Sequence, residues 1–477
     1  MEFAFPVCVI AKISRACLDR APLRIAIAGA EAVLLPLASF RSGVQNPAML
    51  PAFKKLVRFR TLTILPLILC ATVFATPAFA EQSRLAPASA LTNWQVALNC
   101  FQKAGASIGE NKFDRARTEL AAASTKLALP YSTVAAQFVT RLDSAIAISP
   151  DPKNAKRLKA TVMLCAELRA YDVAVRLQSA ASSAEDLEDD LTYPWRLFEA
   201  GNTKAALIEY KRKLAEETVD TFADYYREQI RLAEQRADNR TNVHFSLDLV
   251  RFHYLKGYEE NADSLSAVQE LHRVLPHAVN AKEALAVVEA IISRLGSLGD
   301  ELGRDAWEDR LLSEFKTQPG ACANVLLERG LRAFGKKDYP QTLTLLRQVC
   351  SEYSNTLAYG DAQYTVGLAL QQQEKFDEAV EEYHKIFPSN VRDYDLDPDK
   401  SDDCKNYRHR AALRISECYA AKKDFARAIS YAEQAKERYV YVSYCENCLK
   451  ASKAHLDNRI KELRALAESQ PSVPKTK

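Results

Sequence analysis

The stretch AYGDAQYTVGLALQQQEKFDEAVEEYHKIFP, residues 358–388, decides the fold of this chain. Its small and apolar residues recur at helical spacing in two runs, which a short polar turn separates. Gly367 lies midway along the first run, Phe376 follows the turn, and Ala379 and Tyr383 lie on the second run. Small residues that face each other let two helices approach closely, and the aromatic residue fills the gap between neighbouring pairs. The stretch therefore predicts an antiparallel pair of short helices.

The same arrangement recurs on both sides of this stretch, in residues 321–350 and 406–439. The matching residues are Gly330, Tyr339, Thr342 and Leu346 in the earlier copy and Ser416, Phe425, Ala428 and Ala432 in the later one. Thr342 replaces an alanine, which makes the earlier copy weaker. One helix pair cannot bury its apolar face alone, whereas stacked pairs bury a continuous core. Three copies in succession therefore favour a helical array over an isolated hairpin.

These segments resemble tetratricopeptide repeats, whose unit is about 34 residues long. The step from Gly330 to Gly367 is 37 residues and the step from Gly367 to Ser416 is 49, so the second step contains an inserted loop. The resemblance implies an all-α fold, a right-handed α-solenoid of antiparallel helix pairs, and a role in binding other proteins rather than in chemistry. Weaker upstream copies are marked by Ala104, Phe113, Ala116, Leu120 and Ala123, by Val162, Tyr171, Ala174 and Ala181, and by Ala206 and Tyr210.

Residues 49–80, MLPAFKKLVRFRTLTILPLILCATVFATPAFA, have the order of a secretory signal peptide. Four Lys or Arg residues form the basic start, an apolar run follows over residues 61–74, and Ala78, Phe79 and Ala80 give a small-large-small cleavage site. The apolar run is shorter than the roughly 20 residues that a membrane-spanning helix needs. We therefore expect cleavage after Ala80 and an exported product, periplasmic or secreted, without an integral membrane span. The alternative is an uncleaved anchor.

Composition and helical periodicity along the chain predict how it divides into segments. Residues 1–48 hold no clear element, so we expect translation to begin at Met49, and helical periodicity runs from Thr92 to Ala467. The chain thus divides into a non-native upstream extension (1–48), a signal peptide (49–80), a linker (81–91), an N-terminal helical region with degenerate repeats (92–310), a C-terminal repeat array (311–468) and a tail that is disordered by composition (469–477).

Charge and motifs narrow the class of function. Residues 81–477 contain 55 Lys or Arg and 58 Asp or Glu, a net charge of −3, so no basic excess attracts nucleic acid. The sequence has no glycine-rich phosphate loop, no serine elbow and no paired histidines at metal spacing. We therefore expect no cofactor and no metal, and a protein as the partner.

Three cysteines form the candidate site with the most specific chemistry. Cys445 and Cys448 are expected at the start of the last helix, and Cys404 at the start of an earlier first helix. Successive first helices of an array lie side by side, which makes a structural disulfide from Cys404 to Cys445 or Cys448 reasonable in an exported protein. Free buried thiols, a zinc site that also uses His409, and thiol redox chemistry are the alternatives.

The resemblance also implies a binding groove lined by the first helix of each repeat. Mapped onto this chain, the lining residues are Asn324, Leu327, Glu328 and Leu331, then Tyr364, Thr365, Leu368 and Gln371, then Arg410, Leu413, Arg414 and Glu417. Arg410 and Arg414 match the two basic members of a clamp that holds a peptide carboxylate in some family members. Leu327, Leu331 and Thr365 depart from that clamp, so a mixed apolar and basic groove is expected.

The leading interpretation is a non-catalytic adaptor of the bacterial cell envelope that binds a peptide or a partner helix in this groove. Residues 345–388 are also similar to repeats in envelope-assembly and cell-division accessory proteins. Two other interpretations remain open. The chain could be an enzyme that uses Cys445 and Cys448 or a site within residues 220–318, or it could be a structural element of an assembly, held by its outer faces.

Overall fold

The computed structural model of the chain describes residues 88–180, 193–254, 263–389, 391, 405–443 and 445–469. These residues form helices and turns and contain no strand. The α-helices are α1 (Asn93–Gly109), α2 (Phe113–Lys126), α3 (Tyr131–Ala147), α4 (Ala155–Glu167), α5 (Tyr171–Ala180), α6 (Tyr193–Glu199), α7 (Thr203–Glu216), α8 (Asp220–Gln235), α9 (Val243–Leu249), α10 (Ser264–Val274), α11 (Ala281–Leu298), α12 (Glu301–Glu314), α13 (Pro319–Gly335), α14 (Tyr339–Glu352), α15 (Ala358–Gln372), α16 (Phe376–His384), α17 (Tyr407–Ala421), α18 (Phe425–Glu437) and α19 (Glu446–Ser469). Short 3-10 helices η2 (Ala88–Thr92) and η6 (Leu275–His277) and a π-helical turn η4 (Val250–Tyr254) complete them.

Several predicted segments lie outside the described residues. They are the upstream extension 1–48, the signal peptide 49–80, residues 81–87 of the linker, Ala181, Cys404, and residues 470–477 of the tail. Helix η2 begins within the segment predicted as a linker. None of the described helices combines the length and the apolar character needed to cross a bilayer.

One turn geometry recurs in six of the described helix pairs: α1–α2, α4–α5, α6–α7, α13–α14, α15–α16 and α17–α18. In each turn one residue is left-handed, with φ between 59° and 80°, and the next amide donates to the carbonyl five residues earlier. The left-handed residues are Asn111, Arg169, Gly201, Lys337, Glu374 and Lys423. The upstream hairpins therefore share the local geometry of the three clear ones.

The six pairs also share the position of one buried side chain relative to the turn. The residue five positions after the left-handed one lies on the second helix of each pair, and in all six pairs its side chain is fully buried. These residues are Ala116, Ala174, Ala206, Thr342, Ala379 and Ala428. Thr342 fits because its hydroxyl donates to the carbonyl of Asp338 at 2.7 Å, which satisfies the buried oxygen. The chain is thus an all-α repeat solenoid, as the sequence predicts.

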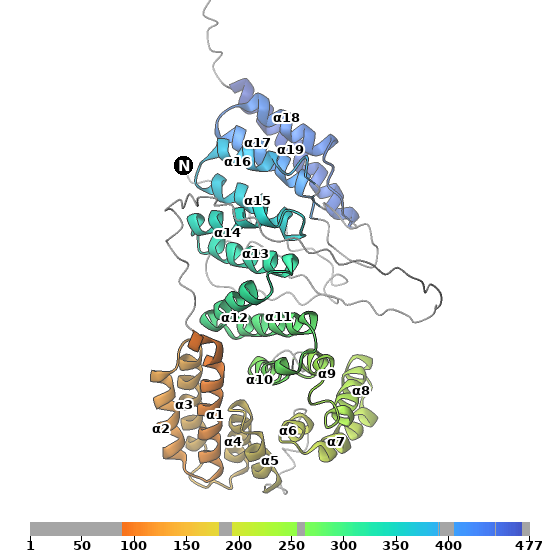
Figure 1. The fold of residues 1–477 in the computed structure, drawn as a ribbon. Coiled ribbons are helices and arrows are strands. Elements are labelled where there is room, and N and C mark those ends of the chain that lie inside the picture. The colour runs from red at the N-terminus through yellow and green to blue at the C-terminus, as the bar shows by residue number, and fades with distance from the viewer. Residues whose placement is uncertain are drawn as a thin grey trace, which may run out of the picture. The chain divides into compact units, whose positions relative to one another are not determined.

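Small residues on the first helices set how closely the pairs pack. A Cβ atom on Gly367 would lie 2.7 Å from Cδ1 of Tyr383 on α16, and a Cβ on Gly330 would lie 2.6 Å from Cγ of Leu346 on α14. In the third pair, the hydroxyl of Ser416 donates to the carbonyl of Ala428 at 2.7 Å. The three predicted pairs are therefore formed, and α13 to α18 follow one another as packed hairpins (Figure 1).

Two buried apolar clusters meet at α13. Cys322 and Val325 belong to the larger cluster, which extends back to α1, whereas Ala323 and Leu326 belong to the cluster of α13–α17. Helix α13 therefore completes the N-terminal core with one face and begins the C-terminal array with another. The predicted boundary between residues 310 and 311 falls within α12.

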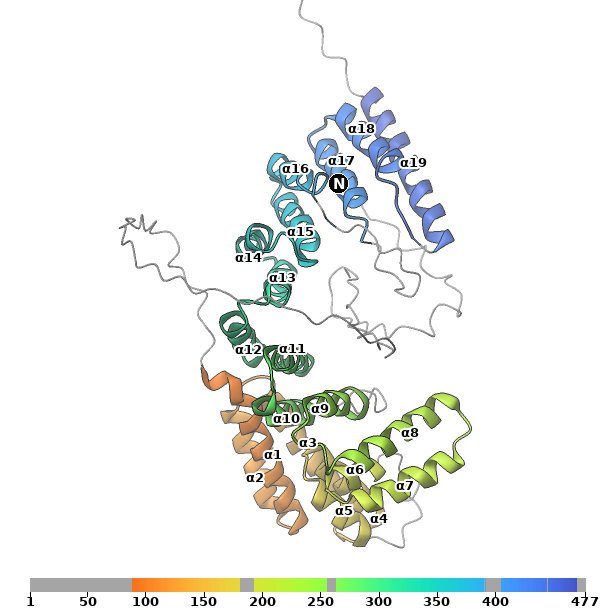
Figure 2. The same cartoon turned by 45° about the vertical axis from the view of Figure 1, so that its right-hand side comes forward.

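Hydrogen bonds also join the beginning and the end of the N-terminal region. The indole of Trp307 on α12 donates to the carbonyl of Leu91 in η2 at 3.2 Å, and the hydroxyl of Tyr131 on α3 donates to Asp300 at 3.0 Å. Figure 2 shows η2 beside α12. Helices α1–α12 thus form one connected body, rather than a row in which only sequence neighbours touch.

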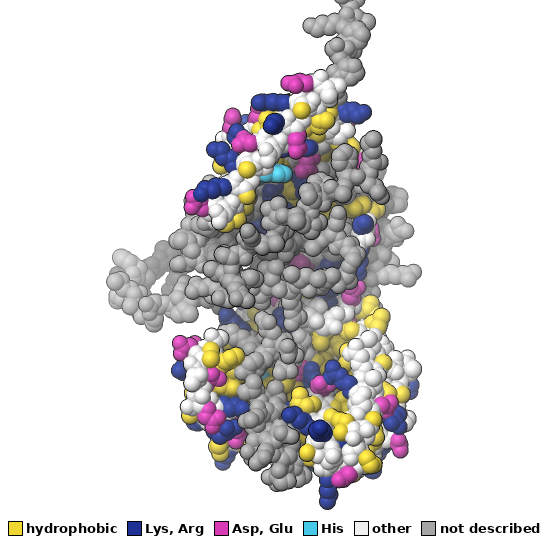
Figure 3. Space-filling model, turned by 180° about the vertical axis from the view of Figure 1, so that it is seen from behind, with side chains coloured by type: hydrophobic (Ala, Val, Ile, Leu, Met, Phe, Trp, Pro, Cys, Tyr) yellow, Lys and Arg dark blue, Asp and Glu magenta, His cyan; other side chains and the backbone are white. Residues whose placement is uncertain are grey.

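The visible charged surface mixes both signs. In Figure 3, Lys and Arg side chains alternate with Asp and Glu over the described helices seen from this side. Many of these charges are paired along one helix, as in Arg212 with Glu216 and Lys450 with Glu446. Such pairs keep the helix surface soluble and contribute only about 0.3–0.5 kcal/mol each.

Candidate functional site

Five of the predicted groove residues come together between α15 and α17. The guanidinium of Arg410 lies 4.0 Å from the ring centroid of Tyr364, and Nε of Arg414 donates to the Tyr364 hydroxyl at 3.1 Å. Nη1 of Arg414 and Nε2 of Gln371 both donate to Glu417, at 2.7 and 3.1 Å. We call these five residues, Tyr364, Gln371, Arg410, Arg414 and Glu417, the groove cluster.

The structure corrects the predicted exposure of Tyr364 and Thr365. Only 4% of Tyr364 and 6% of Thr365 is exposed, so neither side chain is available to a ligand in the way that the sequence indicated. Tyr364 is buried because Arg410 covers its ring and Arg414 reaches its hydroxyl from α17, the next first helix. Tyr364 therefore positions the two arginines instead of contacting a partner itself.

Arg414 is held as a structural cation. Burial alone would lower its pKa, but the oxygens of Tyr364 and Glu417 outweigh burial and raise the pKa of Arg414 above its ordinary value. Two of its N–H groups are already used within the groove cluster. Arg414 therefore has fewer N–H donors left for a partner carboxylate than an unpaired arginine has.

Arg410 differs from Arg414 in its partners. Within the part of the chain that the structure describes, Arg410 stacks on Tyr364 but has no carboxylate partner. Two further predicted residues, Asn324 and Glu328, lie exposed on α13, which packs against α15, whereas the predicted Leu327 of the same helix is buried. The surrounding protein excludes part of the solvent from Glu328 and, together with Glu308 and Asp361, raises its pKa against the effect of Arg332. Among the described residues, Arg410 on α17 is thus a partly exposed arginine without an ion pair, and Glu328 on α13 is an exposed carboxylate.

The cysteines separate into two kinds. Cys165 and Cys418 are fully buried, and burial raises the pKa of each thiol to about 12, as expected for small apolar core residues. Cys445 and Cys448 are exposed where α19 begins, and the Cys448 amide donates to Sγ of Cys445 at 3.2 Å. A disulfide to Cys404 stays a prediction, because Cys404 lies outside the described residues.

The zinc alternative combines His409, Cys445 and Cys448 with Cys404, which lies outside the described residues. The His409 imidazole is buried, and its Nδ1 faces the backbone carbonyls of Ala435 and Tyr439 at 3.1 and 2.8 Å. Over the described ranges, no group of three or more His, Cys, Asp or Glu side chains is arranged to hold a metal ion. His409 instead ties α17 to the end of α18.

Sequence reasoning missed a cavity of about 550 Å³ in the N-terminal region. Its walls come from segments between Gln102 and Arg273, and some of them belong to residues 220–318, where the alternative enzyme interpretation placed an unrecognised site. No short motif marks it, because its lining residues are spread over six helices. One local feature of the cavity lining is Arg169, a charged residue at the left-handed position of the turn between α4 and α5.

No family model matches the chain, and no curated protein matches its sequence. Among solved structures, the chain is similar to the crystal structure of the P58(IPK) TPR domain, with 13% sequence identity and a TM-score of 0.24, over 80% of this chain and 99% of that chain.

Proposed function

We propose that this chain is a non-catalytic adaptor that binds a peptide or a partner helix along α13, α15 and α17. Helical repeats expose an extended surface that suits recognition of another protein, and this chain is such a repeat scaffold. The observation that carries the proposal is Arg410, a guanidinium without a carboxylate partner in the described chain, fixed in place by the buried ring of Tyr364. A preorganised cation of this kind suits a partner carboxylate.

Photo-crosslinking in cells tests where the partner binds. A photoreactive residue at position 328, exposed on the first helix α13, is expected to capture a discrete partner. The matched position is Glu381, exposed on the second helix α16, which should not capture that partner. Capture from position 381 alone would favour the alternative of an assembly element held by its outer faces.

Charge reversal then tests the role of Arg410. We expect Arg410→Glu to lower the affinity for the captured partner about tenfold or more, because it replaces an attraction with a repulsion. Arg427→Glu is the control, since Arg427 also stacks on a tyrosine, Tyr419, but belongs to the second helix α18. Equal affinities of the Arg410→Glu variant and the unmodified chain would contradict groove binding.

We further propose that the adaptor works in the bacterial cell envelope after export. The proposal rests on the signal-peptide pattern of residues 49–80. The native protein, purified from its cells, is expected to begin at Glu81, and Edman or mass-spectrometric sequencing of its N-terminus checks this. A peptide from residues 11–41 in the mature product would rule out both the cleavage and the start at Met49.

A further inference from the structure

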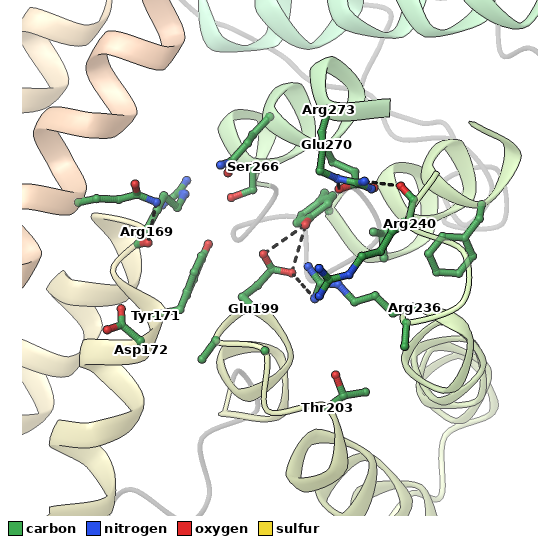
Figure 4. Close-up of a pocket in the computed structure, with 18 residues that line it drawn as sticks. Arg169, Tyr171, Asp172, Glu199, Thr203, Arg236, Arg240, Ser266, Glu270 and Arg273 are labelled. Atoms are coloured by element: carbon green, nitrogen blue, oxygen red, sulfur yellow. Dashed lines mark hydrogen bonds and ion pairs between the residues drawn. The ribbon is translucent and has the colours of Figure 1, made fainter. Parts of the chain in front are cut away.

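The cavity of the N-terminal region has four arginines in its walls. Arg169 comes from the turn before α5, Arg236 and Arg240 from the turn after α8, and Arg273 from α10. Figure 4 shows Arg236 and Arg240 reaching inward from the side opposite Arg169. The cavity volume of about 550 Å³ lies within the range of small-molecule sites.

Buried carboxylates hold three of these arginines in place. Arg169 pairs with Asp263 at 2.8 Å, Arg236 with Glu199 at 3.5 Å and Arg273 with Glu270 at 2.5 Å. Each carboxylate also accepts from a hydroxyl: Tyr171 donates to Asp263 at 2.6 Å, Tyr254 to Glu199 at 3.1 Å and Ser246 to Glu270 at 2.6 Å. Each pair is thus part of a hydrogen-bonded network that fixes the guanidinium.

The arginine side chains of the cavity are more exposed than the carboxylates that pair with them, so a ligand would meet the arginines first. The side chains of the three carboxylates are 1%, 7% and 9% exposed, whereas those of their arginine partners are 20%, 24% and 41% exposed. Arg240 is exposed and has no carboxylate partner among the described residues, and Asp172 is the one exposed carboxylate of the lining. The accessible side of the cavity is therefore cationic, although the total charge of the network is nearly balanced.

Apolar side chains complete the walls. Phe245, Leu249 and the ring of Tyr171 line the same cavity, so a ligand with an apolar body would be accommodated beside the arginines. Guanidinium groups recognise planar or tetrahedral oxyanions through paired N–H donors, and a partly dehydrated cavity strengthens those bonds.

We propose that this cavity binds a small organic molecule that carries an oxyanion, a carboxylate or a phosphate ester, on an apolar body. Arg240 is the contacting residue that is free to neutralise the ligand, and Arg169, Arg236 and Arg273 are positioned by their buried partners to add further N–H donors. The site is independent of the groove cluster.

Three probes with the same aromatic body test the proposal on the full mature chain at low salt. Phenyl phosphate and 3-phenylpropionate carry the two kinds of oxyanion, and benzyl alcohol is the neutral control. We expect calorimetry or ligand-observed NMR to show saturable 1:1 binding of at least one anion, about tenfold tighter than benzyl alcohol. The preferred anion identifies phosphate or carboxylate as the natural group. Equal binding of all three probes, or no saturable binding of either anion, would overturn the proposal.

Arg240 provides the variant least connected to folding. Its backbone carbonyl accepts from Arg273, but its side chain supports no buried partner among the described residues, so Arg240→Gln and Arg240→Glu should fold. We expect about threefold weaker anion binding for Arg240→Gln and at least about tenfold for Arg240→Glu. Arg227→Gln, an exposed change on α8 outside the cavity, should bind as the unmodified chain does, and so should Arg410→Glu. Unchanged anion affinity in Arg240→Glu would contradict the assignment.

Discussion

Replacing Gly367 with leucine is expected to lower the free energy of unfolding of the C-terminal array by at least about 3 kcal/mol, and replacing it with alanine by about 1–2 kcal/mol. A Cβ atom there would overlap the ring of Tyr383, which is fully buried, packs against Tyr364, and donates to Gln371 at 3.0 Å. The ring therefore cannot swing aside. The alanine effect is the smaller one because alanine also gains about 1 kcal/mol of helix propensity over glycine.

Two glycines of α13 provide comparisons for this result. The atoms that a Cβ on Gly330 would meet belong to the flexible end of Leu346, so Gly330→Ala should cost less than Gly367→Ala. A Cβ on Gly335 would meet nothing within 4 Å, so Gly335→Ala should be neutral or stabilise by up to about 1 kcal/mol.

Urea denaturation followed by two probes locates the effect. All three tryptophans, Trp94, Trp195 and Trp307, precede α13, so their fluorescence reports on the N-terminal region, whereas circular dichroism reports on every helix. In Gly367→Leu, the dichroism should show an early transition that the fluorescence does not share. A single transition at the unmodified midpoint would mean that α15 and α16 do not depend on this close approach.

The repeat pattern was sufficient to predict the helix pairs. Gly367, Ala379 and Tyr383 are recognisable in the sequence because close packing restricts those positions to particular sizes, and the same restriction reveals Ala104, Ala116 and Ala206 upstream. The left-handed turn residues were not predictable in this way. Five of the six are not glycine, since their conformation is imposed by the hydrogen bonds of the hairpin.

The sites were less predictable than the fold. Helix periodicity places Arg410 and Arg414 on one face correctly, but it cannot show that Tyr364, from a neighbouring repeat, lies beneath them. The cavity arginines are harder still, because Arg169 and Arg273 are brought together only when separate hairpins close around the cavity. Local spacing therefore predicts faces of helices, whereas contacts between distant segments require the three-dimensional structure.

The junction between the two apolar clusters depends on a buried charge, and its removal is the second large effect that we expect. Glu308 on α12 is 2% exposed, and it pairs with Arg329 at 2.7 Å and Arg332 at 2.6 Å, both on α13. Arg304 lies 3.8 Å away on the same helix. Glu308→Ala leaves these guanidiniums without their shared carboxylate, so we expect a loss of about 3 kcal/mol, the lower part of the range for broken buried pairs because the arginines are partly hydrated.

The location of Glu308 makes this loss measurable at the junction itself. Trp307 is the adjacent residue and is itself buried, so its fluorescence should change at lower urea in Glu308→Ala than in the unmodified chain. Glu308→Gln keeps the shape and some hydrogen bonds, and should lose less. Glu314→Ala on the same helix removes an exposed pair with Arg310 and should change stability by less than about 1 kcal/mol. If Glu308→Ala costs no more than Glu314→Ala, packing by α13 alone, rather than this shared carboxylate, holds the N-terminal core to the repeat array.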